Sequence, residues 1–290
     1  MSKQKLTVAF SGGRTSAFMA WWLKENKSDE YDIKFVFANT GQEHENTLKF
    51  VDQCDKEFGL NLIWLEVVVF MEKGEGSRHK IVTYETASRN GEPYEEVIKK
   101  YGIPNQAFNH CTKNLKLAPM QSWCREVGFQ KAQRAVGIRC DEMDRMSVEA
   151  KKNRVIYPLI SMVPTTKDDV RRWWSNMPFD LEIDEHEGNC VACFKKSKRK
   201  ILTLIAEGNS NKYFDWCNYI EETYGMTNTS EGEKSRVFGR NYMSIKDLKE
   251  MAEQPFKKFV DTPNKQIGMF DMEWDAANDC SESCEVNFDE

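Results

Sequence analysis

The sequence lacks any run of about 18 consecutive apolar residues, the minimum for a transmembrane helix. Its first residues, MSKQKLTVAFSGG, have neither the long apolar core nor the small-residue cleavage site of a signal peptide. Positive charge does not dominate either, because the formal net charge is −5 and no field over the whole chain indicates a nucleic-acid partner. We therefore expect a cytoplasmic protein that does not use a membrane.

Internal repeats and two common phosphate-binding fingerprints are absent as well. The sequence contains neither the Walker pattern G-x-x-x-x-G-K-[ST] nor the dinucleotide pattern G-x-G-x-x-G. The composition is that of an ordinary globular protein, with 40% apolar and 30% charged residues in a chain of 290. This length predicts one domain of about 200 residues with an appendage, or two domains.

Short apolar runs alternate with helical patterns in the first 70 residues. Strands are predicted at 6–10, 33–38 and 61–70, and helices at 15–26 and 44–59. Nearly continuous apolar strands that alternate with helices are typical of a parallel sheet covered on both faces. The sequence therefore predicts an α/β fold with a doubly wound, mostly parallel sheet.

The remainder of the chain is less regular. Residues 71–110 are polar and rich in glycine, so we expect an excursion or lid there rather than core. Further elements are predicted at 113–127 (helix), 131–138 and 154–160 (strands) and 166–174 (a helix capped by Thr166). Beyond residue 205 the pattern is helical until the acidic end of the chain, which we expect to be mobile.

The stretch SGGRTS at 11–16 directly follows the first strand and precedes a helix. In an open parallel sheet, ligands bind beyond the carboxyl ends of the strands. Gly12 and Gly13 let the backbone approach an anion, and a helix N-terminus offers free N–H groups. Ser11, Thr15 and Ser16 add hydroxyls, and Arg14 adds a forked cation. This pattern favours an anion site; the alternative is a tight turn with a serine cap.

Two other strand ends carry polar residues. Asn39, Thr40 and Gly41 follow the second strand, and Arg139 in GIRCDE follows the strand predicted at 131–138. Arg139 suits a bidentate contact with phosphate or sulfate. The alternatives are a plain Asn-Thr-Gly turn and a salt bridge from Arg139 to a nearby carboxylate of the segment DEMD.

Nine cysteines in a chain without an export signal indicate a reducing compartment, where spaced cysteines more often bind metal or act in redox chemistry. Cys190 and Cys193 form a C-x-x-C pair that suits one metal, and the adjacent KKSKRK at 195–200 is expected to lower their pKa. The alternative is a pair of free thiols. KKSKRK is interpreted as a solvated helix face, with a polynucleotide phosphate contact as the alternative.

Several segments, taken together and in order, resemble one known family. SGGRTS is similar to the PP-loop, usually SGGKDS, of the adenine nucleotide alpha hydrolases. FANTGQEHENT, CTKNLKLAPM, GIRCDEMDR, YPLI with TTKDDVRRW, and CVAC resemble successive segments of the phosphoadenosine phosphosulfate (PAPS) reductase-like branch of that superfamily. The resemblance covers roughly residues 5 to 205.

The resemblance implies ATP with Mg²⁺ as ligands. It implies ATP-binding residues Ser11, Gly12, Gly13, Arg14, Thr15, Ser16, Asn39, Thr40, Gly41, Gly137 and Arg139, with Arg14, Ser16 and Arg139 also catalytic. It further implies a 4Fe–4S cluster on Cys111, Cys190 and Cys193, with zinc as the competing metal. The fourth ligand stays open between water, a substrate sulfur and the side chains of His110, Cys124 and Cys140. Cys54 and Cys217 are interpreted as packing residues.

Three parts of the chain follow from this interpretation. Residues 1–205 are expected to form the PP-loop nucleotide-binding α/β domain with its inserted excursion at about 71–110. Residues 206–270 are expected to form a helical C-terminal region, and 271–290 an acidic tail that carries Cys280 and Cys284. The oligomeric state is left open.

The sequence also departs from the family pattern. Arg14 and Thr15 replace the lysine and aspartate of the usual loop, a variation that resembles phage-encoded and DNA-sulfur-modification relatives. The C-terminal Glu-Cys-Gly-(Leu/Ile)-His segment that carries the nucleophilic cysteine of PAPS reductases is absent.

Three functions are therefore compared. The first is an ATP-dependent enzyme that adenylates a substrate, releases pyrophosphate and couples this to sulfur transfer, with nucleic acid as the favoured substrate and a sulfur-donor protein as partner. The second is a reductase of an adenylyl sulfate, in which Cys280 or Cys284 supplies the thiol. The third is a non-enzymatic regulatory protein that binds nucleotide and cluster.

Overall fold

The structure, a computed structural model, describes residues 3–184, 186–188, 190–229 and 232–260. The acidic tail expected at 271–290, with Cys280 and Cys284, lies outside these residues. Among the described residues, none of the helices combines the length and the apolar character needed to cross a membrane.

A six-stranded sheet in the order β4-β3-β2-β1-β5-β6 forms the centre of the fold. Its strands are β1 (Gln4–Phe10), β2 (Tyr31–Ala38), β3 (Ile63–Val69), β4 (Ser77–Val82), β5 (Gln133–Ala135) and β6 (Val155–Ile156). The pairings are parallel except that between β3 and β4, which is antiparallel. The predicted α/β fold with a mostly parallel, doubly wound sheet is confirmed.

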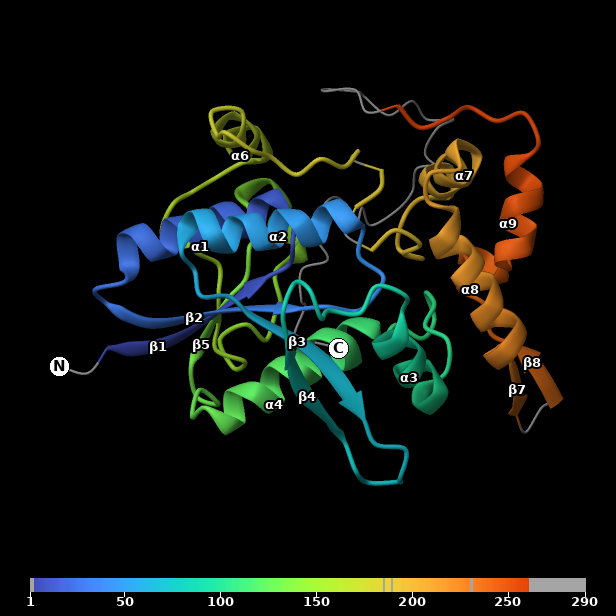
Figure 1. The fold of residues 1–290 in the computed structure, drawn as a ribbon, viewed down its shortest axis with the longest axis horizontal. Helices are drawn as coiled ribbons and strands as arrows, with labels where there is room; N and C mark the ends of the chain where they lie inside the picture. Colours follow the sequence, from blue (N-terminus) through green and yellow to red (C-terminus); the bar gives the residue numbers. More distant parts are fainter. Residues whose placement is uncertain (1–2, 185, 189, 230–231, 261–290) are drawn as a thin grey trace.

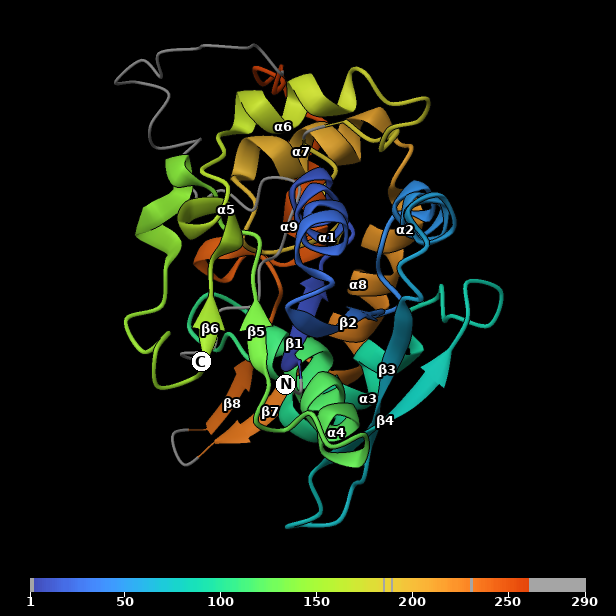
Figure 2. The ribbon, with the colours of Figure 1, turned by 90° about the vertical axis from the view of Figure 1, so that its left-hand side faces the viewer.

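Helices cover both faces of this sheet (Figures 1 and 2). One face carries α1 (Arg14–Lys27) and α2 (Glu45–Phe58), with α6 (Lys167–Trp174) outside them, and the other carries α4 (Ala118–Glu126). Side chains alternate along a strand, so Val8 and Phe10 pack with the first layer while Ala9 between them packs with the second. The predicted cap of α6 is present, because Thr166 and Asp169 form a reciprocal capping box.

The segment 71–110 does not form the expected lid. It contributes β4 to the main sheet and α3 (Glu92–Tyr101), whose Val97 and Ile98 are buried in a second apolar cluster. β4 is an edge strand, and its charged sequence SRHKIV leaves most side chains half-buried or exposed. That polarity is what made the segment resemble a loop.

The second apolar cluster joins this segment to the C-terminal helices. Its walls come from α3, the π-helix η1 (Thr112–Leu117), α7 (Lys198–Glu207), α8 (Asn211–Tyr224) and α9 (Ile245–Ala252). In Figure 1 the three C-terminal helices stand beyond the carboxyl end of β2. A hairpin of β7 (Met226–Thr229) and β8 (Gly232–Ser235), which the sequence did not predict, follows α8. The boundary expected at residue 205 falls inside α7.

Two predicted strands are shorter than expected. The strand predicted at 131–138 pairs only over β5, and the one at 154–160 only over β6. Pro158 then begins the short helix α5 (Pro158–Ser161), since proline lacks the N–H that a further ladder bond would need and suits the first turn of a helix. The 3₁₀ segments η2 (Cys140–Arg145) and η3 (Arg240–Tyr242) complete the described elements.

A half-buried carboxylate, that of Glu221, links the C-terminal helices and makes their stability depend on pH. Glu221 of α8 accepts hydrogen bonds from the backbone N–H groups of Phe238 (2.7 Å) and Ile245 (2.8 Å). Burial nevertheless raises the pKa of Glu221 to about 7 from 4.5. Between these values the unfolded chain loses the proton while the folded chain keeps it, so rising pH destabilises the fold.

We expect Glu221→Gln to remove this part of the pH dependence. Wild type should lose about 1–3 kcal/mol from this group between about pH 5 and pH 7.5, measured by urea unfolding. Glu222→Gln, on the exposed side of the same helix, should behave as wild type. A Glu221→Gln profile that parallels wild type would contradict the assignment.

Candidate functional site

Three loops meet at the carboxyl edge of the sheet. β2, β1 and β5 are neighbours and parallel, so the residues that follow them, 11–16, 39–41 and 137–139, share one edge. The strand order reverses between β1 and β5, where ligands of open α/β sheets bind. Arg139 crosses this point, because its Nη1 donates to Oγ1 of Thr15 at 2.9 Å. The structure thus brings together the residues that the sequence predicted at this edge, including the buried Gly137.

The loop 11–16 has a backbone that only glycine allows at one position. Gly12 has φ of +88°, and a Cβ there would lie 2.8 Å from Cγ2 of Thr47 on α2. The hydroxyl of Ser16 accepts from the N–H (3.1 Å) and hydroxyl (2.9 Å) of Ser11 and donates to the carbonyl of Gly13 (2.9 Å). These hydrogen bonds hold the loop in shape, and the predicted role of Ser16 at phosphate stays a prediction.

Arg14 is turned toward the segment after α6. Its Nε lies 2.6 Å from Oδ1 of Asp180, and its Nη2 donates to Oδ2 at 3.1 Å. The indole Nε1 of Trp174 donates to the backbone carbonyl of Arg14 at 3.0 Å. The guanidinium of Arg14, which was predicted to contact phosphate, therefore forms an ion pair with Asp180 next to the start of α1.

Arg139 forms the salt bridge that was one of its two predicted roles, and its contact with phosphate or sulfate stays a prediction. Its Nε donates to Asp141 (3.0 Å) and its Nη2 lies 3.3 Å from Glu142, so the salt bridge is present. The same guanidinium contacts the loop through Thr15. Its side chain is only 7% exposed, which fixes its direction.

The loop after β2 is organised by two buried carboxylates. Asn39 donates through Nδ2 to Glu66 (2.7 Å), and Thr40 donates through its backbone N–H and hydroxyl to Glu43 (2.9 Å). Burial raises the pKa of Glu43, although Lys116 and the Thr40 hydrogen bonds oppose that rise. Gly41 has φ of +81°, and a Cβ added there would lie 3.0 Å from the Gly91 backbone. This position therefore also requires glycine.

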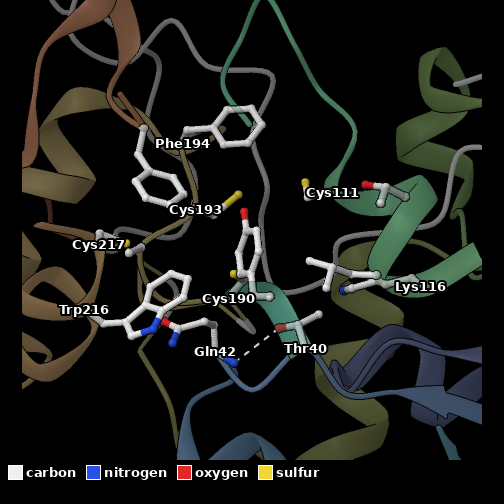
Figure 3. Close-up of a pocket in the computed structure, with 14 residues that line it drawn as sticks. Thr40, Gln42, Cys111, Lys116, Cys190, Cys193, Phe194, Trp216 and Cys217 are labelled. Atoms are coloured by element: carbon white, nitrogen blue, oxygen red, sulfur yellow. Dashed lines mark hydrogen bonds between the residues drawn. The ribbon is translucent and has the colours of Figure 1, made fainter. Parts of the chain in front are cut away.

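Four cysteines line one cavity next to this loop (Figure 3). Cys111, Cys190 and Cys193 were predicted together, whereas Cys217 of α8 was predicted only to pack. The cavity and its mouth enclose about 530 Å³. The other lining residues are Thr40, Gln42, Tyr94, Thr112, Leu115, Lys116, Ala192, Phe194, Trp216 and Phe238.

The wall that carries Cys111 is a π-helix. Cys111 precedes η1, in which the Ala118 N–H bonds the carbonyl of Lys113, five residues back. Pro119 lacks an N–H to bond the carbonyl of Leu115, which disfavours regular α-helical bonding at this turn. Such π segments occur frequently at functional sites.

The loop of Cys190 and Cys193 rests on the segment that follows β2. Glu43 and Cys190 form an isolated antiparallel bridge, and the hydroxyl of Tyr213 donates to the carbonyl of Glu43 at 3.0 Å. Lys196 closes the loop by donating to the carbonyls of Cys190 (2.5 Å) and Val191 (2.9 Å). The same chain segment therefore touches the cysteine cavity and the edge that carries Thr40.

The prediction that KKSKRK at 195–200 forms a solvated helix face is wrong. Lys196, Arg199 and Lys200 are buried, and Ser197 caps α7 instead. The expected lowering of the thiol pKa is also wrong for Cys190, because burial raises that pKa and outweighs the opposing charges of Lys196 and Lys116.

Three residues that line this cavity also carry buried polar atoms without hydrogen-bond partners among the described residues. Oε1 of Gln42, Oγ1 of Thr112 and Nε1 of Trp216 are buried and form no hydrogen bond with other described atoms. Buried polar groups are normally paired, so these three atoms indicate a polar ligand or water in the cavity. Thiol donors with such neighbours suit a thiolate-bound metal or iron–sulfur cluster.

None of the three side chains considered as a fourth ligand lines this cavity. His110 bonds the carbonyl of Gly102 (2.9 Å), Cys124 lies 3.7 Å from the hydroxyl of Thr7 in another cavity, and Cys140 donates to the carbonyl of Leu159 (3.5 Å). Within the described ranges, no three His, Cys, Asp or Glu side chains are grouped closely enough to hold a single metal ion as they stand.

Comparison with known proteins places this geometry in a family. The model of the phosphoadenosine phosphosulfate reductase domain matches residues 5–156, and the chain belongs to that family. The chain is 31% identical to the uncharacterized nin region protein ORF290 of Escherichia phage lambda, over 96% of this chain and 94% of that protein. This relative agrees with the expectation of a phage-encoded member.

Two further similarities are more distant. The chain is 28% identical to the uncharacterized protein MJ0066 of Methanocaldococcus jannaschii, over 53% of this chain and 27% of that protein. It is also similar to the PAPS reductase of Candida auris in complex with phosphate, with 16% identity, a TM-score of 0.36, and coverage of 60% of this chain and 74% of that one.

We predict that Gly12→Ala destabilises the protein more than Gly74→Ala. Both glycines have positive φ, so both variants pay about 1–2 kcal/mol for a left-handed alanine, but nothing lies within 4 Å of a Cβ at Gly74. The excess for Gly12→Ala should be about 1 kcal/mol or more in urea unfolding.

The Thr47→Ser background tests the cause of that excess. Serine keeps the hydroxyl but removes the Cγ2 methyl that a Cβ at Gly12 would meet. The excess should shrink in the double variant. Equal losses for Gly12→Ala and Gly74→Ala would show that the contact does not matter.

Proposed function

We propose that this protein is an ATP-dependent enzyme of the PP-loop type, which adenylates a substrate, releases pyrophosphate and couples this step to sulfur chemistry at the four-cysteine cavity. Membership of the PAPS reductase domain family supports nucleotide binding. The observation that carries the proposal is the shared segment after β2, because Thr40 contributes to both the nucleotide edge and the lining of the cysteine cavity.

The nucleotide would bind at the loop 11–16. The positive end of the α1 dipole and its free N–H groups suit the β- and γ-phosphates, and Gly12 lets them approach the backbone. Arg139 holds the loop through Thr15 and adds charge beneath it. Mg²⁺, when bound, would neutralise phosphate charge. A substrate oxygen then attacks the α-phosphorus and pyrophosphate leaves.

Arg14 and Arg139 are both paired with carboxylates, Arg14 with Asp180 and Arg139 with Asp141 and Glu142. The pairing with Asp180 holds the charge of Arg14 near the start of α1, from where its guanidinium would contact phosphate. The hydroxyl of Ser16 also holds the loop in shape by donating to the carbonyl of Gly13. Arg14 and Thr15 stand where the usual loop carries lysine and aspartate.

The cysteine cavity would hold a 4Fe–4S cluster, with zinc as the competing metal, through Cys111, Cys190 and Cys193. Such a cluster supplies a site for sulfur or electron transfer. This chain places the thiols, buries them with apolar neighbours and brings them to the segment of Thr40. A sulfide-level nucleophile, held at this site or brought by a donor protein, would attack the adenylated carbon, so that a C–S bond forms while the C–O bond breaks and AMP leaves. Nucleic acid is the proposed substrate class, and the cytoplasm the proposed compartment.

A reductase of an adenylyl sulfate is the second candidate. The family match at residues 5–156 favours it, since the model is named for that activity. A thiol from Cys280 or Cys284 would then be required, and sulfite release from an adenylyl sulfate would identify the reaction. Loss of that release in Cys280→Ser or Cys284→Ser would place the reductase first.

The proposal predicts that Arg139→Lys weakens ATP binding. Lysine keeps the charge but loses the fork that joins Thr15 to the two carboxylates, so affinity should fall about tenfold or more in calorimetry, together with pyrophosphate release. Arg145→Lys is the matched control, because the Nη1 of Arg145 donates to the same Glu142 at 2.5 Å. Wild-type protein that binds no ATP would overturn the PP-loop assignment.

The cysteine cavity predicts metal content directly. Protein purified without oxygen should contain iron and sulfide, and Cys111→Ser, Cys190→Ser or Cys193→Ser should lower both and bleach the visible absorbance. Cys54→Ser, in the separate core under α2, should leave both unchanged. Stoichiometric zinc without sulfide would rule out the cluster.

A further inference from the structure

We infer that Cys217 is the fourth protein thiolate of the metal centre in the cysteine cavity. This inference rests on the proposed function for the presence of a metal, but it concerns a residue that the motifs do not contain. Cys217 lies in the sequence DWCNY, 24 residues after Cys193 and without a C-x-x-C partner. Its position in the fold, and not its spacing, identifies it.

The fold carries Cys217 to the cavity on a separate wall. Figure 3 shows Cys190 and Cys193 between Cys217 on one side and Cys111 on the other. The loop of Cys190 and Cys193, the start of η1 and the middle of α8 thus each contribute to one site. Cysteine ligands of iron–sulfur clusters come from such separated segments, and four thiolates complete the usual set.

The immediate neighbours of Cys217 support this role. Trp216, the residue before it, also lines the cavity, and its buried Nε1 has no hydrogen-bond partner among the described atoms. Tyr94 also lines the cavity and packs against Trp216, with ring centroids 5.4 Å apart.

The three other side chains considered as the fourth ligand form contacts away from this cavity. His110 and Cys140 bond backbone carbonyls, and Cys124 lines a cavity under α4. Cys217 is 2% exposed, so water does not compete for it through an open surface. Each thiol must lose its proton to bind metal, and that proton passes to solvent on assembly.

The test compares iron retention in wild type, Cys217→Ser and Cys124→Ser after anaerobic reconstitution. Wild type and Cys124→Ser should each hold about four irons per chain through mild ferricyanide oxidation. Cys217→Ser should fall to about three or fewer and show the EPR signal of a three-iron cluster. Circular dichroism establishes that the variants are folded. Cys217→Ser that retains iron as wild type does would overturn the inference.

A second measurement needs no substitution. With four protein thiolates no iron keeps an open coordination position, so cyanide should leave the EPR spectrum of the reduced wild-type protein unchanged. A cyanide-dependent spectrum would show three thiolates and overturn the inference even if the variants fail to fold.

The metal content of wild type separates this inference from the proposed function. Zinc that is present without sulfide and is lost in Cys217→Ser would refute the cluster but support Cys217 as a ligand. Wild type that takes up neither iron nor zinc would refute both.

Discussion

The buried carboxylate of Glu43 joins the two halves of the candidate site. Its side chain accepts from Thr40, which shapes the loop after β2, and its backbone pairs with Cys190 and accepts from Tyr213. The nucleotide edge and the cysteine cavity therefore share one short segment. Without that segment, the loop of Cys190 and Cys193 would lack its contact with the sheet, and α8 would lose one of its anchors to the sheet.

Most of the nucleotide edge could be predicted from the sequence because it depends on local rules. A strand, two glycines and a helix start fix where the loop 11–16 lies, and parallel strands bring Asn39 and Arg139 to the same edge. What could not be predicted was the direction of long side chains. Arg14 pairs with Asp180, 166 residues away, and no local pattern connects these two residues.

The cysteine cavity could be predicted from the sequence only in part. The C-x-x-C pair is a local signal, but Cys217 is one cysteine in an aromatic helix, and its sequence resembles that of a packing residue. The polar segment 71–110 was misinterpreted for a related reason. Half of β4 faces solvent at a sheet edge, and α3 is buried only because the C-terminal helices cover it. Both features depend on contacts between distant segments.

The residues of the candidate site lie partly inside and partly outside the segment that matches the family model. The family model ends at residue 156, so it contains the loop 11–16, Arg139 and Cys111. Cys190, Cys193 and Cys217 all follow that point, within the region that the phage relative also spans. The loop 11–16 and Arg139 therefore lie in the part that matches the family model, and the cysteine cavity is completed by the C-terminal helices. Because the second apolar cluster holds those helices against α3 and η1, the geometry of the cysteine cavity depends on packing outside the family domain.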